Sequence, residues 1–570
     1  MVAQTMRSGF RKEKKLHMSA FASLVRVLAG VTSMRRTFAF AIASILLLGT
    51  GPAAQARVDA KAAPGSATFV VTGHGWGHGV GMSQYGAYGY AQKGVGYAKI
   101  VLHYFPGTEL GDAPVSKVRV LMTSGVSTLP VGSASDFRVK DGTGAVHDVA
   151  AGKYTLTPAL KLKVDGAATA RALPGPLLFQ PGTAPLQLKH LYRGSMQVDV
   201  VSGKLRAINL VGLEQYLYGV VPSEMPYTWA PEALKAQAVV ARSYALATRR
   251  SGAFDLYPDT RSQVYLGVEH EKPATTSAVD ATAGQVVLYQ GEVAKTFFFS
   301  TSGGRTASAE DVWGSAVPYL VSVPDPYDSI SPHHTWGPVA YTGAALAKRL
   351  KLKGQVVDVQ SQLNSSGRIK TLTIVGSQNT VTIPGASVRQ RLGVQSTWFT
   401  VGVLSLSAPQ SAVVYGSRAQ LTGVARGMSD AVLQQLDGSS WTDVGSVKPA
   451  SDGTVTLSIK PPVTTRYRLA TGKVSAPPVR VPVASFVRFD APRTPDQLSG
   501  YVRPLSLAGA RVLIQRHQGS GWVTAAQATV AADGSFAAKL QLVDGVYRAH
   551  VGSGRGYVAG TTPPLQVSNQ

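Results

Sequence analysis

The side chain best suited to chemistry in this sequence is the carboxyl group of Glu224, in the segment Pro222-Ser223-Glu224-Met225-Pro226. The two prolines restrict the backbone on both sides of the Glu and keep the segment out of regular structure. A carboxyl group held this stiffly is suited to act as general acid and base. A solvated surface Glu, the alternative interpretation, needs no such restraint. We therefore take Glu224 as the candidate catalytic residue.

Two predicted elements flank this segment. The aromatic and β-branched stretch Tyr216–Val221 predicts an internal strand. A long helix is predicted from Pro231 to about Arg250, because Pro suits the first helical position and no Gly or Pro follows until Gly252. The sequence thus predicts a strand, a rigid loop that carries Glu224, and a helix.

A glycine-rich segment, Phe69–Gly94, offers the next candidates. It matches neither a phosphate-binding loop nor a nucleophile elbow around Ser83. His74 and His78 stand four residues apart, but a glycine-rich loop would not hold them as a helical zinc pair and no Glu lies between them. We therefore predict no metal and no cofactor. Two interpretations remain: a sugar-binding groove wall built from aromatic faces and polar groups, or a packing corner rich in glycine.

A polar turn follows the predicted buried strand Phe297–Phe299 and contains Ser302, with Arg305 just beyond it. Such a turn can hold a polar ligand, although an ordinary capped turn has the same composition. Together the two segments supply the candidate substrate-binding residues, which are His74, Trp76, His78, Gln84, Tyr85, Ser302 and Arg305.

Composition and targeting signals indicate where the protein works. The chain has 570 residues, no Cys and a formal net charge of +25. Arg35-Arg36, an apolar run over 38–48 and the small-residue site at 54–56 predict a secretory signal peptide, so we expect a secreted protein that begins near Arg57 with a charge of about +18. No permanent transmembrane anchor is expected, and a basic exported protein is attracted to anionic wall polymers such as teichoic acids rather than to nucleic acid.

The domain boundaries are predicted from changes of composition and of strand-and-turn spacing along the chain. We expect an α+β catalytic region with a β-rich subdomain, followed by two small all-β sandwich domains. Trp441 and Trp522 take matching positions in two similar units about 80 residues long. The predicted boundaries are 1–56 for the N-terminal extension and signal peptide, 57–68 for a linker, 69–402 for the catalytic region with 115–210 as its β-rich part, and 403–482 and 483–570 for the repeats.

Six ordered blocks of the chain resemble the SpoIID/LytB family. They are GHGWGHGVGMSQYGA, YLYGVVPSEMP, PEALKAQAVVARSYAL, DTRSQVYLG, FFFSTSGGRTASAEDVWG and RLGVQSTWF. The resemblance implies a fold of the SpoIID type and action on peptidoglycan glycan strands. In the sporulation branch this is lytic transglycosylase activity at the MurNAc–GlcNAc bond, with strands stripped of stem peptides preferred. The family's catalytic Glu falls on Glu224, whereas the LytB branch implies enhancement of a separate cell-wall amidase.

The chemistry adds its own requirement. Glycoside hydrolysis usually uses two carboxyl groups, and the sequence offers one that is rigidly presented. A lytic transglycosylase can work with one, provided that burial raises the pKa of Glu224; Met225, Tyr227 and Trp229 are the expected apolar walls. The alternatives are a non-catalytic glycan-binding enhancer of an amidase and a plain wall-binding protein. Unlike the sporulation proteins, this chain is expected to have a cleavable signal and two added sandwiches, a difference that argues against a role in sporulation.

Overall fold

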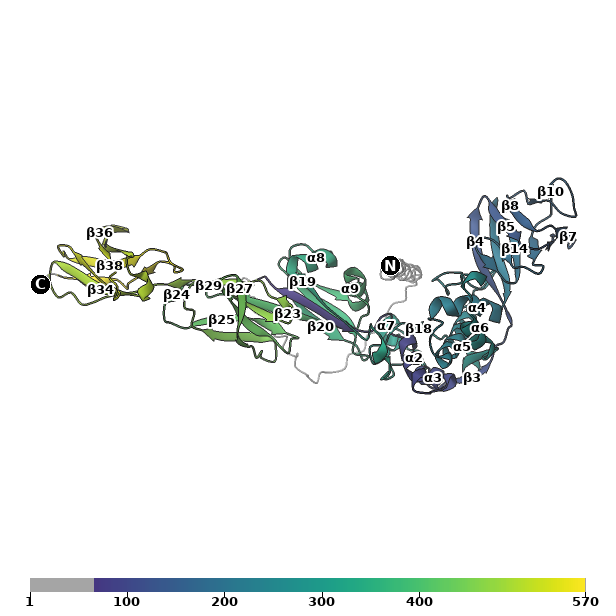
Figure 1. Ribbon diagram of the computed structural model, residues 1–570, viewed down its shortest axis with the longest axis horizontal. Coiled ribbons are helices and arrows are strands. Elements are labelled where there is room, and N and C mark those ends of the chain that lie inside the picture. The colour runs from purple at the N-terminus through teal and green to yellow at the C-terminus, as the bar shows by residue number, and fades with distance from the viewer. Residues whose placement is uncertain (1–65, 569–570) are drawn as a thin grey trace, which may run out of the picture. The chain divides into compact units, whose positions relative to one another are not determined.

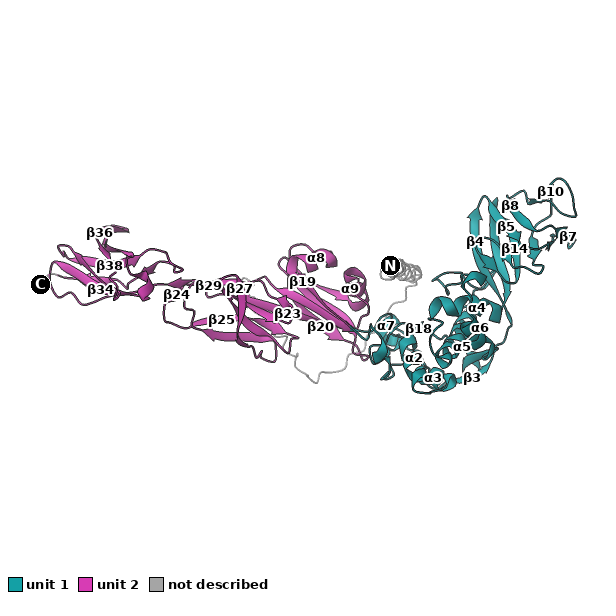
Figure 2. Ribbon diagram, in the orientation of Figure 1, with its two compact units in different colours: residues 1–56, 74–335 teal, residues 57–73, 336–570 magenta. Residues whose placement is uncertain are grey.

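The computed structural model of the protein describes residues 66–568, so the predicted signal peptide and most of the predicted linker lie outside the described residues. The chain is β-rich, with few helices and several small sheets. Its described residues divide into two compact units (Figure 2): His74–Thr335 forms unit 1, whereas residues 66–73 join those from Trp336 onward in unit 2. The predicted catalytic range, 69–402, therefore contains parts of both units.

Unit 1 is built around one long helix, α5, which begins at Pro231 as predicted and ends at Ala247. Twelve of its residues are buried, so neighbouring elements cover it on most sides. The guanidinium of Arg242, fully buried in α5, donates to the Glu214 carboxylate in α4 and to the Gln285 carbonyl, which ties three elements together. The other helices of at least eight residues described in this unit are α2 (Gln84–Gln92), α3 (Tyr97–Tyr104), α4 (Leu213–Glu224) and α6 (Pro273–Asp280).

The predicted strand over Tyr216–Val221 is wrong, because this stretch lies inside helix α4. Its buried residues recur at helical spacing, three and four apart, and one face of the helix is therefore apolar. Pro222 lies in the last turn of α4, where it has no N–H to continue the helical hydrogen bonds, and the helix ends two residues later. The buried residues of α4 are Leu213, Tyr216, Leu217, Gly219, Val220 and Val221.

Between Lys117 and Gly212 the described chain forms strands and no helix (Figure 1). Two sheets share a core with α4 and α5, so this β-rich part supports the helix that ends at Glu224. The larger sheet has the order β4 (Lys117–Val126), β15 (Lys204–Gly212), β14 (Ser195–Val201), β11 (Leu177–Gln180), β6 (Phe137–Lys140) and β7 (Val146–Val149). The smaller has the order β13 (Leu191–Tyr192), β12 (Leu186–Gln187), β5 (Leu129–Ser133) and β8 (Gly152–Leu156).

Unit 2 begins with a sheet that joins distant parts of the chain. Strand β1 (Thr68–His74) lies between β19 (Thr335–Thr342) and β23 (Phe399–Ser407), and Thr68 pairs with Leu404 in antiparallel register. The sheet continues with β25 (Ala419–Arg426) and β28 (Thr454–Ile459). One of its faces is covered by α8 (Gly343–Leu350), α9 (Gly385–Leu392) and a small sheet of β20 (Val356–Leu363), β21 (Ile369–Gly376) and β22 (Thr380–Pro384).

Beyond β23 the described residues form strands and a single three-residue helical turn. Two apolar cores follow one another, each enclosed by strands from two sheets. In the first, the second sheet is β26 (Val432–Asp437), β27 (Ser440–Ser446), β29 (Thr465–Thr471), β30 (Val474–Ser475) and β31 (Val479–Val481). In the second, β33 (Phe486–Phe489), β34 (Gln497–Arg503) and β37 (Ser535–Lys539) face β35 (Arg511–Gln518), β36 (Gly521–Thr529), β38 (Gly545–Val551), β39 (Gly560–Thr561) and β40 (Leu565–Val567).

None of the helices within residues 66–568 combines the length and the apolar character that crossing a bilayer requires.

Candidate active site

Glu224 is the last residue of α4, and one hydrogen bond holds its side chain while another holds its backbone carbonyl. The backbone N–H of Val264 donates to Glu224 Oε1 at 3.2 Å. The side-chain amide of Gln84 donates to the backbone carbonyl of Glu224 at 3.0 Å. Met225, which ends the helix, is buried beneath it. Glu224 thus sits at the end of a helix and not in the loop that the two prolines predicted.

Glu224 is partly exposed as a residue. Its carboxyl group is nevertheless surrounded by protein, and burial raises its pKa from 4.5 to about 7, against the smaller opposing effect of the Val264 hydrogen bond. Its position at the carboxyl end of α4 acts in the same direction as burial, because the negative end of a helix dipole disfavours a second negative charge. Two phenols feel the Glu224 charge: Tyr244 has its pKa raised to about 12 and Tyr216 well above 10, in each case chiefly by burial. The site is therefore dry enough to keep a carboxylic acid partly protonated at neutral pH.

The helix α2 brings Gln84 to Glu224. Ser83 caps this helix, since its Oγ accepts from the Gly86 N–H at 3.1 Å. Gln84 Nε2 also lies 3.3 Å from Oε1 of Gln237, a fully buried residue of α5. The Gln84 side chain is thus fixed between α4 and α5. Gln84 is one of the predicted substrate-binding residues, and the structure places it in contact with Glu224.

An aromatic wall stands beside these residues. Tyr88 stacks on Trp229 with a 4.6 Å centroid separation and an interplanar angle of 9°, and Tyr85 meets the same indole at 4.7 Å and 60°. The two tyrosines lie three residues apart on α2 and so share a helix face. Trp229 and Tyr88 pack against the cluster that contains Met225. Flat aromatic faces of this kind stack on sugar rings.

The remaining glycine-loop candidates gather around a different set of residues. Trp76 meets the His333 ring at 4.3 Å, and His74 lies edge-on to His334 at 6.4 Å. His334 Nδ1 in turn pairs with the buried carboxylate of Asp328 at 2.5 Å. His78 accepts from the Val80 N–H and its ring packs among Phe297, Phe299 and Trp313.

Ser302 and Arg305 take separate places. Ser302 is fully buried, its Oγ accepts from the Gly304 N–H, and it also bonds to the carboxyl group of Asp325, whose pKa burial raises to about 6. Arg305 is exposed and donates to Ser322 Oγ at 3.4 Å. The assignment of these two residues to substrate binding stays a prediction.

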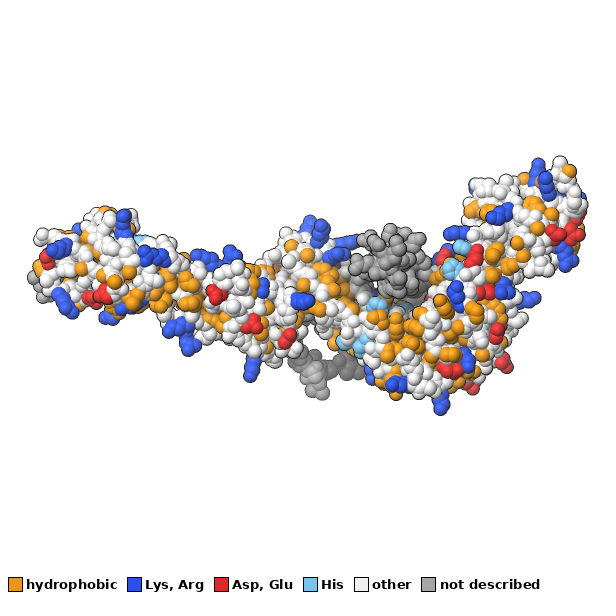
Figure 3. Space-filling model, viewed as in Figure 1, with side chains coloured by type: hydrophobic (Ala, Val, Ile, Leu, Met, Phe, Trp, Pro, Cys, Tyr) orange, Lys and Arg blue, Asp and Glu red, His pale blue; other side chains and the backbone are white. Residues whose placement is uncertain are grey.

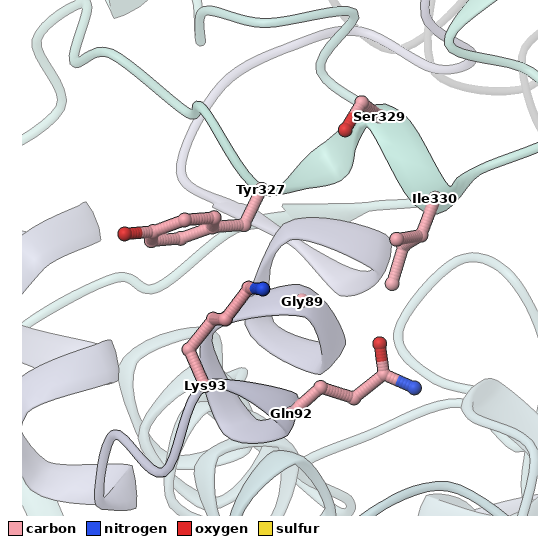
Figure 4. A pocket seen from close by; sticks show the side chains of 6 residues that line it. All are labelled: Gly89, Gln92, Lys93, Tyr327, Ser329 and Ile330. Atoms are coloured by element: carbon pink, nitrogen blue, oxygen red, sulfur yellow. The ribbon is translucent and has the colours of Figure 1, made fainter.

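A depression with a volume of about 650 Å³ lies farther along α2 (Figure 4). Figure 4 shows Gln92 and Lys93 rising from the helix toward Tyr327 and Ile330. Its lining residues are Gly89, Gln92, Lys93, Tyr327, Ser329 and Ile330. Glu224 is not among them, so this depression is separate from the surroundings of the Glu224 carboxyl group.

Residues that the sequence reasoning missed complete the site. Val264 supplies the hydrogen bond to the carboxyl group, and the neighbouring Gln263 is buried with its Oε1 3.4 Å from the Tyr216 hydroxyl. Both belong to the block DTRSQVYLG, which the sequence singles out without assigning it a role. Within residues 66–568, no group of three or more His, Cys, Asp or Glu side chains is arranged to hold a metal ion.

The fold and the site define a class of protein with one enclosed carboxyl group at the end of a helix. Beside this group lie the hydrogen-bonded side chains of Gln84 and Gln237 and the aromatic wall. Residues 201–289, which include Glu224 and Val264, match the family model SpoIID, stage II sporulation protein. The chain thus carries a SpoIID domain, and the resemblance to the SpoIID/LytB family is confirmed.

Three relatives show the extent of the similarity. An uncharacterized protein of Brachyspira hyodysenteriae is 41% identical over 136 residues, which are 23% of this chain and 37% of that protein. Stage II sporulation protein D of Bacillus subtilis is 33% identical over 214 residues, 34% of this chain and 61% of the relative. The amidase enhancer of Bacillus subtilis is 42% identical over 113 residues, 20% of this chain and 15% of the relative. The chain spans less than two thirds of the length of each of these relatives.

Proposed function

We propose that this protein is a secreted peptidoglycan lytic transglycosylase that cleaves the MurNAc–GlcNAc bond and leaves 1,6-anhydroMurNAc ends. The observation that carries the proposal is the enclosed carboxyl group of Glu224, with a pKa of about 7. A carboxyl group with this pKa is present in both its protonated and its ionised form near neutral pH. A residue that serves first as acid and then as base requires both forms.

The proposed reaction balances without a second carboxyl group. Protonated Glu224 gives its proton to the glycosidic oxygen as the bond from that oxygen to C1 of MurNAc breaks. The resulting carboxylate takes the proton of the C6 hydroxyl of the same sugar, and the C6 oxygen bonds to C1. No water is consumed, and Glu224 ends protonated as it began.

The surroundings of Glu224 favour this route over two-carboxyl hydrolysis. Within residues 66–568, no acidic side chain contributes to the pKa shift of Glu224, which comes from burial and is reduced by the Val264 N–H. A hydrolase would need a second carboxyl group about 5 to 9 Å away to act as nucleophile or base. The aromatic wall of Tyr85, Tyr88 and Trp229 gives the glycan a surface to stack on, and Gln84 is a polar neighbour for the reacting sugar.

The test is a digestion of purified cell wall by the full chain and by Glu224→Gln. Products are read by mass spectrometry, in which anhydro ends lie one water below hydrolysed ends. Glu224→Gln should fold and release no anhydromuropeptides, whereas the exposed Glu292→Gln serves as the matched control and should keep full activity. Equal product yield from Glu224→Gln would refute the assignment. Parallel digests of peptide-free and intact glycan show which substrate the protein accepts.

A second candidate function is enhancement of a separate cell-wall amidase through glycan binding. It is favoured by the relative named amidase enhancer, which is 42% identical over 113 residues. The same digest separates the two, because an enhancer leaves no anhydro ends unless an enzyme is added and raises the release of stem peptides when an amidase is present. In that case Glu224→Gln would retain the enhancement.

A further inference from the structure

Each of the two β-rich repeats in unit 2 carries the same cluster of three side chains. In the first, the Arg468 guanidinium lies 4.1 Å from the centroid of the Trp441 ring, and its Nε donates to Gln434 Oε1 at 2.8 Å. We call Gln434, Trp441 and Arg468 the first platform.

The second platform is Gln515, Trp522 and Arg548, and it repeats the same geometry. The Arg548 guanidinium lies 4.2 Å from the Trp522 ring centroid, and its Nε donates to Gln515 Oε1 at 2.7 Å. Two clusters that agree to within about 0.1 Å in one chain are not an accident of side-chain placement.

The backbone beneath the platforms is also duplicated. Gln434 pairs with Arg468 across β26 and β29, and Gln515 pairs with Arg548 across β35 and β38. In each repeat a register shift falls immediately before the Gln, between Leu433 and Gln434 and between Ile514 and Gln515. The extra residue of each bulge lies on the partner strand, Val444 in β27 and Ala525 in β36, so the same local change of strand twist lies beside both platforms.

The platforms face away from the apolar cores. Tyr467 and Tyr547, which precede the two arginines, are buried, and alternation along a strand then directs Arg468 and Arg548 to the opposite, partly exposed face. Within residues 66–568 the only hydrogen bond that either guanidinium group makes is through its Nε. The terminal nitrogens therefore keep their N–H groups for a ligand.

We propose that each platform binds one phosphate of a repeating phosphodiester polymer of the cell envelope, and that the two platforms bind the same polymer together. The planar fork of Arg matches phosphate oxygens, and the Trp face beneath holds the guanidinium in one orientation before the ligand arrives. A polymer that repeats its charge suits a protein that repeats its binding site, because the second contact becomes intramolecular.

The charge of the repeats fits an anionic partner. The ranges 403–482 and 483–570 each hold eight Lys or Arg and four Asp, with no Glu. Figure 3 shows basic side chains spread over the visible face of unit 2. One difference separates the platforms: Asp443 accepts from the Gln434 amide, whereas Thr524 occupies the matching register position beside Gln515. The second platform has no such acid, so it should bind the more tightly.

The experiment measures binding of the full chain to a synthetic poly(glycerol phosphate). The variants are Arg468→Gln, Arg548→Gln and the double substitution. The matched control is the double substitution of Arg480 and Arg511 by Gln, which removes the same charge from two exposed arginines, one in each repeat. A carboxylate polymer, polygalacturonate, tests whether phosphate is preferred, and melting curves follow the fold.

Each single platform substitution should weaken binding about tenfold or more, with the larger loss for Arg548→Gln. The control should change binding less than twofold. The double substitution to Lys, which keeps charge and fold, should also bind several-fold more weakly, because Lys has no planar fork. Equal losses in the platform and control variants, full retention by the Lys variant, or no binding by the unmodified chain would each overturn the proposal. A fall in melting temperature with unchanged binding would mean that the clusters only stabilise the sheets.

Discussion

Replacing Glu224 by Gln should stabilise the protein at neutral and alkaline pH while removing its activity. The pKa of Glu224 is raised in the folded state from 4.5 to about 7 by burial. Below pH 4.5 the carboxyl group is protonated whether the chain is folded or unfolded, and the substitution then costs little. Between pH 4.5 and 7 the unfolded chain loses the proton first, so the stability of the wild type falls as pH rises through the folded pKa.

The size of the effect follows from the shift. Each pKa unit corresponds to about 1.4 kcal/mol, so a shift of this size gives an upper value of about 3 kcal/mol for the penalty above pH 7. A domain of the size of unit 1 gains roughly 2 to 4 °C in melting temperature per kcal/mol. The melting temperature of Glu224→Gln should thus exceed that of the wild type by roughly 6 to 12 °C at pH 8 and by almost nothing at pH 4.

The assay is thermal unfolding of both proteins, followed by calorimetry from pH 4 to pH 9, with Glu292→Gln as the control for a charge removed from the surface. A pH-independent difference between Glu224→Gln and the wild type would show that the Glu224 carboxyl group is solvated. The acid–base role would then lose its physical basis even if the variant were inactive. Loss of activity together with a pH-dependent gain of stability is the result that the structure predicts.

Two further predictions concern the surroundings of this carboxyl group and the β-rich part of unit 1. Gln84→Leu removes the hydrogen bonds to Glu224 and Gln237, and it should lower kcat about tenfold with the fold intact; an unchanged rate of anhydro-end release would contradict this. His147, which bonds to Asp141 and Asp165 and lies beside Arg171, has its pKa raised by these two carboxylates, so its stabilising effect is complete below its unfolded pKa of about 6.5 and is lost as pH rises through the folded value. His147→Gln should therefore lower the melting temperature more at pH 5.5 than at pH 9, and an equal loss at both would rule out the charged pair.

The helix α4 shows where reasoning from the sequence succeeded and where it failed. The choice of Glu224 came from its two neighbouring prolines, and the structure does place this carboxyl group in an enclosed position with a raised pKa. The strand predicted for Tyr216–Val221 was wrong. The prediction gave more weight to the aromatic and β-branched residue types than to the apolar residues that recur three and four positions apart from Leu213 onward. Testing that spacing would have found the helix and put Glu224 at its carboxyl end.

Other features could not be found in this way. The hydrogen bond from Val264 to Glu224 joins residues 40 apart, and the one from Gln84 joins residues 140 apart. Nothing local to either residue specifies its partner, because tertiary packing brings the elements together. Helix α2 did carry a local signal, since Ser83 stands directly before it as its cap. The α5 helix, with Pro231 at its start, was predicted correctly for the same kind of reason.

The pairing of β1 with β23 has a consequence for how the chain matures. The Thr72 and Thr400 hydroxyls are 2.9 Å apart, although 328 residues separate them in the chain. During synthesis β1 can pair with β23 only after all of unit 1 and the part of unit 2 up to Ser407 have been made, so the sheet closes late. A chain that stops short of β23 would leave β1 with an open hydrogen-bonding edge and a tendency to self-associate. Fragments intended for expression therefore have to keep residues 68–74 together with 399–407, or omit both.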